Sequence, residues 1–200
     1  MIQQLVLASG NNAKLRELST LLAGQVREVI KQSDLGVSDA EETGLSFVEN
    51  ALLKARHAAQ QTGLPALADD SGLVVPALQG QPGIYSARYA GSLSNSVANN
   101  TKLLQVMADL QGEQRQACFH CCIVYVQHAN DPVPLIAAAD WHGYILDAPR
   151  GEQGFGYDPV FYVPDYACSA AELAPEVKNR ISHRAQAMQQ CLNLLRDKVI

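Results

Sequence analysis

The sequence has little that would place the protein in a membrane or outside the cell. None of its apolar runs approaches the roughly 20 residues that a membrane-spanning helix needs. The first residues, Met1 to Ala8, carry no basic start, and their apolar core is too short for a signal peptide. We therefore expect a cytoplasmic protein that has no membrane partner.

The five cysteines are an odd number and show no disulfide framework. Residues 118–122 read Cys-Phe-His-Cys-Cys and look at first like a metal knuckle. A structural zinc site needs a second ligand pair, and Cys168 and Cys191 do not supply one at knuckle spacing. We predict that these cysteines are small, buried apolar residues of a strand.

Positive charge is also scarce. The 15 lysines and arginines face 20 acidic residues, which gives a net charge of −5. This balance argues against a nucleic-acid partner, so any anionic ligand must meet local positive charge. The chain has no repeat, low-complexity tract or linker, and 48% of its 200 residues are apolar. One domain is expected, or one core split into two lobes.

Strand patterns alternate with helix patterns along the chain. Leu5 to Ala8 reads as a buried strand, and Leu15, Leu18 and Leu22 then mark one face of a helix. The remaining predicted strands cover residues 26–30, 67–78, 116–127, 135–145 and a last one at 160–163, and the remaining predicted helices cover 47–62, 96–110 and the C-terminal stretch that follows Arg184.

The helix at 47–62 has clear boundaries. Ser46 and Glu49 form a capping box at its start, and Gly63 provides the C-cap. Asn50 and Lys54 are four residues apart and share a face. Lys54 is either merely exposed or reaches into a cleft.

The stretch Leu67-Ala68-Asp69-Asp70-Ser71-Gly72 is central to the chain. Side chains alternate across a strand, so Asp69 and Asp70 are expected to face opposite sides. One would hold the backbone while the other points into a cleft. Like charges this close need a cation or hydrogen-bond donors nearby. The alternative is an Asx turn that closes a β-hairpin.

Residues 9–14, Ser-Gly-Asn-Asn-Ala-Lys, connect the first strand to its helix. Backbone N–H groups and the helix dipole favour a phosphate at such a turn. The stretch lacks the Walker P-loop pattern. Lys14 can also be an ordinary solvated lysine. A second open question is Glu42, which lies in a polar loop and is either solvated or faces a metal.

Two further groups point to a ligand. Residues 151–159 form a glycine-rich loop in which Phe155 suits stacking on a planar base, although a β-bulge with one aromatic tucked inward is the alternative. Lys178, His183 and Arg184 gather hydrogen-bond donors before the final helix, where a solvated basic patch is the alternative.

Six stretches, taken together and in order, closely resemble the inosine triphosphate pyrophosphatase family, which hydrolyses non-standard purine nucleoside triphosphates as a house-cleaning activity. Ser9 stands where many members have threonine, and the hydroxyl is kept. The stretches are residues 9–14 (SGNNAK), 47–51 (FVENA), 68–72 (ADDSG), 82–88 (PGIYSAR), 155–159 (FGYDP) and 182–184 (SHR).

The resemblance implies an α/β fold over residues 1–200, with a long twisted mixed β-sheet, flanking helices and two lobes around a central cleft. It also implies a homodimer that depends on Mg²⁺. Asp70 would be the general base and a metal ligand, with Glu42 helping at the metal. The resemblance further implies a substrate-binding set made of Ser9, Gly10, Asn11, Asn12, Ala13, Lys14, Lys54 and Ser71 at the phosphates, and Phe155, Gly156, Tyr157, Asp158, Lys178, His183 and Arg184 at the base and sugar.

The implied substrates are ITP, dITP and XTP, purine triphosphates with a carbonyl at C6, and the implied products are the monophosphate and pyrophosphate. Physical chemistry agrees, because a triphosphate carries about four negative charges and an acidic protein needs lysines and a metal to bind it. Two other functions stay open on the residues alone. One is a phosphatase that releases orthophosphate, and the other is a nucleotide sensor without turnover.

Overall fold

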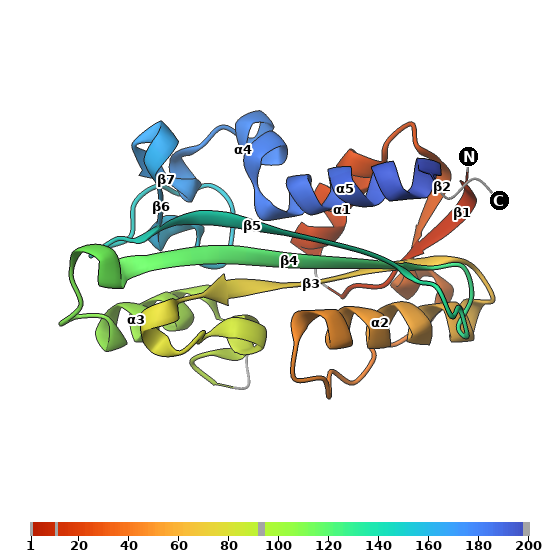
Figure 1. Cartoon of the computed structure of the whole chain (residues 1–200), viewed down its shortest axis with the longest axis horizontal. Helices are drawn as coiled ribbons and strands as arrows, with labels where there is room; N and C mark the ends of the chain where they lie inside the picture. The colour runs from red at the N-terminus through yellow and green to blue at the C-terminus, as the bar shows by residue number, and fades with distance from the viewer. Residues whose placement is uncertain (1, 11, 92–94, 198–200) are drawn as a thin grey trace. The chain divides into compact units, whose positions relative to one another are not determined.

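The computed structural model describes residues 2–10, 12–91 and 95–197. It contains a seven-stranded sheet with the strand order β2-β1-β3-β4-β5-β6-β7 and with helices packed on it (Figure 1). The strands are β1 (Ile2–Leu7), β2 (Val26–Lys31), β3 (Ala66–Val74), β4 (Gln116–Val126), β5 (Leu135–Ile145), β6 (Phe161–Val163) and β7 (Cys168–Ser169). The α-helices are α1 (Asn12–Leu22), α2 (Phe47–Thr62), α3 (Ser96–Val106), α4 (Pro175–Ile181) and α5 (His183–Asp197).

The sheet is mixed. β1 runs parallel to both β2 and β3, with Val6 in register with Ala66. β6 runs antiparallel to its neighbours β5 and β7. The predicted class, an α/β protein with a mixed sheet and flanking helices, is confirmed.

The chain divides into two compact units. Unit 1 contains residues 1–70, 121–139 and 183–200, and unit 2 contains residues 71–120 and 140–182. The three strands β3, β4 and β5 each contribute residues to both units.

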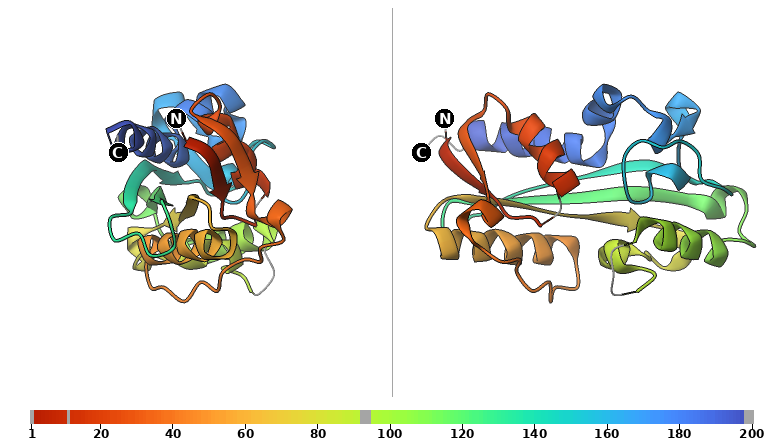
Figure 2. Two further views of the ribbon diagram at one scale, coloured as in Figure 1. Left: turned by 90° about the vertical axis from the view of Figure 1, so that its right-hand side faces the viewer. Right: turned by 180° about the vertical axis from the view of Figure 1, so that it is seen from behind.

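Unit 1 is built on the two faces of its strands. Leu67 of β3 belongs to a core cluster with leucines of α1 and apolar residues of α5. Ala66 and Ala68 belong to a second cluster with the alanines of α2. Figures 1 and 2 show α1 and α5 on one side of these strands and α2 on the other. This alternation fixes where Asp69 and Asp70 point, because they continue the same strand.

Helix α2 has the predicted boundaries and caps. The Ser46 hydroxyl accepts a hydrogen bond from the Glu49 N–H, and the Glu49 carboxylate accepts from the Leu45 N–H at 2.9 Å. Gly63 adopts a left-handed conformation with φ of 70°, and its N–H donates to the Ala59 carbonyl. A glycine makes this conformation without strain, which ends the helix where the sequence predicts.

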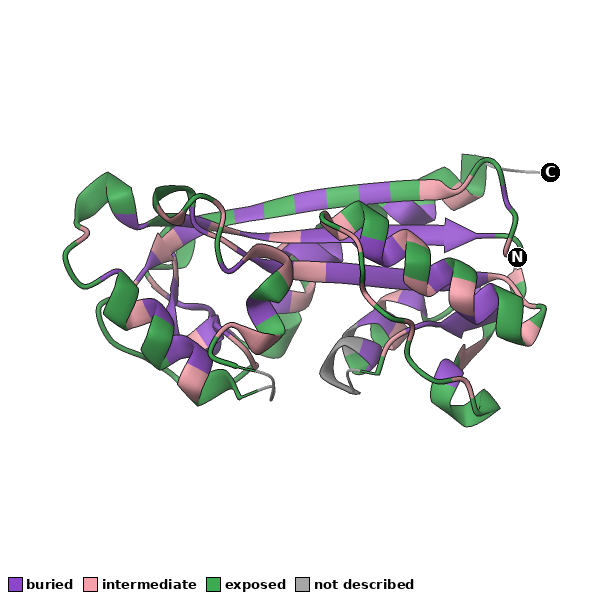
Figure 3. Cartoon of the chain, turned by 90° about the horizontal axis from the view of Figure 1, so that it is seen from below, coloured by how far each residue is buried: buried purple, intermediate pink, exposed green. Residues whose placement is uncertain are grey.

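Unit 2 has an aromatic core. The ring centroids of Phe119 and Phe161 lie 4.6 Å apart, and those of Trp141 and Phe161 lie 5.2 Å apart. β5 alternates between buried and exposed residues, as the colours of Figure 3 show, and Trp141 is one of its buried residues.

Two of the three cysteines of β4 are buried as the sequence predicts, whereas Cys118 is half-buried. Cys121 and Cys122 are buried, and burial raises the pKa of the Cys122 thiol to about 11. No group of three or more metal-ligating side chains occurs among the described residues. Within the same part of the chain, no helix has the length and apolar character that crossing a membrane requires.

The structure corrects several of these predictions. The first strand, β1, spans Ile2–Leu7 rather than Leu5–Ala8. β3 stops at Val74, because Pro76 lacks an N–H and starts a short 3₁₀ helix. α3 stops at Val106 rather than Leu110, because the chain tightens there: the N–H groups of Ala108 and Leu110 donate to carbonyls three residues back instead of four. The Arg115 guanidinium binds the carbonyls of Met107 and Leu110 at 2.9 and 3.1 Å. β6 is not the last strand, because the chain turns back and Cys168 pairs antiparallel with Val163.

Candidate active site

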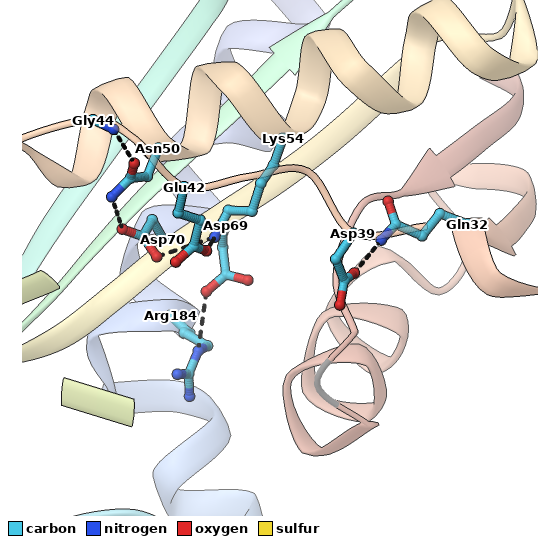
Figure 4. Close-up of polar contacts among 9 residues, drawn as sticks. All are labelled: Gln32, Asp39, Glu42, Gly44, Asn50, Lys54, Asp69, Asp70 and Arg184. Atoms are coloured by element: carbon cyan, nitrogen blue, oxygen red, sulfur yellow. Dashed lines mark hydrogen bonds and ion pairs between the residues drawn. The ribbon is translucent and has the colours of Figure 1, made fainter. Parts of the chain in front are cut away.

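The Asp70 carboxylate is buried beneath helix α2 in unit 1. Its Oδ1 accepts a hydrogen bond from Lys54 Nζ at 3.0 Å, and its Oδ2 accepts one from Asn50 Nδ2 at 3.4 Å (Figure 4). Asn50 and Lys54 are one helical turn apart, so the predicted shared face is confirmed and turns toward Asp70. Lys54 therefore reaches inward and is not simply an exposed residue.

Lys54 joins two carboxylates. Its ammonium lies 2.9 Å from Glu42 Oε1 and 3.0 Å from Asp70 Oδ1. Asn50 Oδ1 accepts a hydrogen bond from the Gly44 N–H at 2.8 Å, which fixes the loop that carries Glu42. We call Glu42, Asn50, Lys54 and Asp70 the Lys54 cluster.

The pKa of Lys54 reflects these neighbours. Burial alone would lower the pKa of this ammonium group, but the charges of Asp70, Asp69 and Glu42 outweigh burial and raise the pKa above that of an ordinary lysine. Lys54 therefore stays charged at neutral pH. Its contribution to stability is lost only when the pH rises above the pKa of an ordinary lysine. The cluster holds one positive charge between two carboxylate oxygens.

Asp69 faces the other side of β3. Its Oδ2 lies 3.6 Å from Arg184 Nε at the start of α5, and both side chains are buried. The two aspartates therefore face opposite sides of a strand interior, as the alternation predicts. The hairpin-turn interpretation of residues 67–72 was wrong, and Arg184 is a side-chain partner of Asp69 that the sequence did not reveal.

The Asp69→Asn substitution is expected to lower the free energy of unfolding by about 3 kcal/mol, because it leaves a buried guanidinium without its carboxylate. Chemical denaturation of the variant and of the wild type measures this difference. Turnover should fall much less than it does in Asp70→Asn. A variant of Asp69 that is fully stable but inactive would contradict this assignment.

The predicted phosphate turn is described only in part. Ser9 is half-buried just after β1, and Gly10 is exposed. The backbone of Gly10 lies against the Asp39 carboxylate, so a side chain added at Gly10 would force Asp39 to move. Asn11 lies outside the described residues. Helix α1 begins with Asn12, Ala13 and Lys14, of which the structure describes the backbone and not the side chains.

The glycine loop, residues 151–158 of unit 2, is organised around the Asp158 carboxylate. Asp158 Oδ2 accepts hydrogen bonds from the Phe155 N–H at 2.7 Å and from Lys178 Nζ at 2.6 Å. Lys178 Nζ also lies 5.1 Å from the centroid of the Phe155 ring. A Cβ at Gly154 would lie 2.1 Å from Asp158 Oδ2, so the loop can wrap the carboxylate only with glycine there. The structure thus brings together Phe155, Asp158 and Lys178.

The two aromatic residues of this loop differ. Tyr157 is buried and donates a hydrogen bond from its hydroxyl to the Ser86 carbonyl at 2.8 Å. Phe155 is only half-buried. One aromatic is therefore tucked inward while the other is partly exposed, and the loop is a series of turns rather than the β-bulge of the alternative interpretation. Ser71, the first residue of unit 2, is half-buried beside the buried Asp70.

The solvated-patch interpretation of the basic residues was wrong. Lys178, His183 and Arg184 are all buried, with exposed fractions of 7%, 2% and 5%. Lys178 belongs to a short separate helix, α4, which the sequence analysis did not find, whereas His183 and Arg184 begin α5. Lys178 and Arg184 each face an aspartate, so their charges are balanced.

Comparison with known proteins places the chain. The model of the Ham1 family matches residues 5–194, nearly the whole sequence. The chain belongs to the Ham1 family. The resemblance seen in the sequence motifs is therefore confirmed over the full length of the fold.

Ham1 proteins of known name or structure are close in sequence. The dITP/XTP pyrophosphatase of Legionella pneumophila (strain Lens) is 59% identical over 98% of this chain and all of its own, and the one of Photorhabdus laumondii is 55% identical over the same shares. The structure of a HAM1 protein from Coxiella burnetii superimposes with a TM-score of 0.91 at 49% identity, over 98% of this chain and all of that one. The Staphylococcus aureus Ham1 protein gives a TM-score of 0.87 at 39% identity, over the same shares.

Proposed function

We propose that this protein hydrolyses dITP, ITP and XTP to the nucleoside monophosphate and pyrophosphate. The observation that carries the proposal is the Lys54 cluster, where a buried ammonium lies between two carboxylates. Such a site can hold a cation, a phosphate and an attacking water within reach of one base. The names of the Ham1 relatives support the choice of substrates.

The residues fit a magnesium ion. Glu42 and Asp70 offer carboxylate oxygens on either side of the position that the Lys54 ammonium takes. Mg²⁺ prefers one or two carboxylates together with phosphate oxygens and water, and this cluster matches that preference. When bound, the ion would neutralise charge on the phosphates during displacement.

The chain's own residues would then carry out the proton transfer. Asp70 accepts a proton from the attacking water as general base, while the Asn50 amide holds its second oxygen in place. Lys54 moves its positive charge from the carboxylates to the phosphates of the nucleotide. Ser9, Gly10 and the first turn of α1 offer backbone N–H groups and a helix dipole to the same phosphates.

Base selection is assigned to donor side chains. Lysine only donates hydrogen bonds, so Lys178 can pair with a carbonyl at C6 and not with the amino group of adenine. Asp158 fixes the Lys178 ammonium, and the Phe155 ring beside it offers a flat surface for a purine. We further propose that the protein is a cytoplasmic homodimer without a nucleic-acid partner.

The product distinguishes the proposal from the two other functions. With Mg²⁺, dITP should yield pyrophosphate and dIMP in equal amounts, and chelation of the metal should abolish the reaction. Ion chromatography of the reaction mixture identifies both products. Release of orthophosphate would point to a phosphatase, and tight nucleotide binding without turnover would point to a sensor. Either result would refute the proposed reaction.

A further inference from the structure

Helix α3 carries two buried asparagines that have no role in the site described above. Asn99 and Asn100 are 4% and 7% exposed, in a helix whose other buried residue is Leu103. Asparagine is a poor helix former, and an apolar side chain would pack there at less cost. Their contacts must therefore account for them.

Asn99 is fully engaged with the segment that precedes the helix. Its Nδ2 donates to the carbonyls of Ser86 and Ala87 at 3.3 and 3.1 Å, and its Oδ1 accepts from the Ala90 N–H at 2.7 Å. Asn99 thus fixes the 3₁₀ segment Gly83–Arg88 on α3.

Asn100 reaches the glycine loop instead. Its Nδ2 donates to the carbonyl of Gly156 at 3.1 Å, across 56 positions of sequence. Its Oδ1 is buried and accepts no hydrogen bond from the described residues. The hydrogen bond to Gly156 is therefore the contact that accounts for an asparagine at this position.

The glycine loop needs such an anchor. Gly151, Gly154 and Gly156 have φ values of 79°, 77° and 65°, so the backbone here has few side chains to restrain it. Asp158 holds the Phe155 N–H, and Tyr157 is tied to Ser86. The carbonyl of Gly156, next to Phe155, is tied to Asn100.

We infer that Asn100 is a positioning residue for purine recognition, acting through Gly156 to orient Phe155. This inference rests on the proposed function and extends it to a residue outside the assigned site. Replacing the amide donor leaves the reacting groups of the Lys54 cluster untouched. Binding of the nucleotide should therefore suffer while the chemical step does not.

The test compares Asn100→Asp, which keeps the shape and removes the donor, with Asn100→Ala and with Asn95→Ala as a control. Asn95 caps the same helix by accepting from the Ala98 N–H, so its loss weakens α3 without touching Gly156. Both Asn100 variants should raise the KM for dITP about tenfold and leave kcat within about twofold, the size expected when a buried hydrogen bond is lost. Asn95→Ala should change neither value. The inhibition constant of pyrophosphate should stay unchanged in all variants.

Hydrogen exchange measured by mass spectrometry gives a readout that does not depend on turnover. Peptides that cover residues 151–158 should exchange about tenfold faster in the Asn100 variants than in wild type or Asn95→Ala. Unchanged exchange would overturn the anchor, and faster exchange with an unchanged KM would overturn its role in recognition. If Asn100→Asp does not fold, Asn100→Ala decides both points. A wild-type protein that does not hydrolyse dITP would instead refute the proposed function, which exchange alone cannot do.

Discussion

The Asp70→Asn variant is expected to turn over dITP at least about 100-fold more slowly than the wild type, the low end of what a general base contributes. Asparagine keeps the shape of the side chain but can neither accept a proton nor offer a charged oxygen to a metal. The acceptor for Lys54 at 3.0 Å is weakened at the same time. The loss should therefore appear in kcat as well as in the metal concentration needed for activity.

Asp69→Asn is the matched control for this experiment, because the same change is made one residue away on the opposite face of β3. Steady-state kinetics with dITP and thermal unfolding of both variants separate chemistry from folding. A folded Asp70→Asn variant with near-normal turnover would refute the assignment of Asp70 as the base.

The Lys54→Met variant is expected to lose about 3 to 5 kcal/mol of stability at pH 7, since removal of one partner leaves buried carboxylates without their counter-charge. The Lys54 side chain is 13% exposed, and those of Glu42 and Asp70 are 28% and 9% exposed. Water therefore cannot solvate the two carboxylates well once the ammonium is removed. The two carboxylates and Asp69 would then repel one another.

This defect should depend on pH. Without the ammonium, the carboxylates bind protons more tightly in the folded state than in the unfolded state, where their pKa values are near 4. The folded variant then binds more protons than the unfolded chain, so its stability falls as pH rises above about 4. The wild type keeps the contribution of Lys54 across this range, because the pKa of that group is raised. The difference between the two proteins should be smaller at pH 5 than at pH 8.

Divalent metal should compensate for the missing ammonium. Lys54 competes with a cation for the same two oxygens, so Lys54→Met should bind Mn²⁺ more tightly than the wild type when no nucleotide is present. Isothermal titration with Mn²⁺ measures the affinity, and the shift in Tm on adding Mg²⁺ provides a second readout. Lys31→Met, which removes an exposed lysine at the end of β2, controls for net charge. Equal metal affinity in the wild type and Lys54→Met would contradict a shared cation position.

Local signals in the sequence predicted helix α2 with its caps and most of the strand and helix positions. Ser46, Glu49 and Gly63 encode the limits of α2 through contacts with near neighbours, which a single sequence displays. The ends of β3 and α3 were harder to predict from the sequence. After α3 the chain is held by Arg115, whose guanidinium binds the carbonyls of Met107 and Leu110, and no local pattern in the sequence predicts that contact.

In the candidate site, too, features set by near neighbours in the sequence were predicted and contacts with distant residues were not. Strand alternation placed Asp69 and Asp70 on opposite faces, and helical spacing placed Asn50 beside Lys54. The partners of these residues come from distant positions, such as Arg184 for Asp69 and Lys178 for Asp158. Asn100 left no sign except an unusual buried amide in a helix, which is visible only once burial is known. The functions of the site residues stay predictions until the variants are measured.

Direct competition between two substrates tests whether the protein selects a purine with a carbonyl at C6. Equimolar dITP and dATP are incubated with the protein and Mg²⁺, and the two monophosphates are quantified from the same tube, with Asp70→Asn run in parallel to exclude a contaminating enzyme. We predict that dIMP exceeds dAMP by at least about 100-fold, because a buried donor rejects a base that offers another donor at C6. Equal formation of dIMP and dAMP would contradict it.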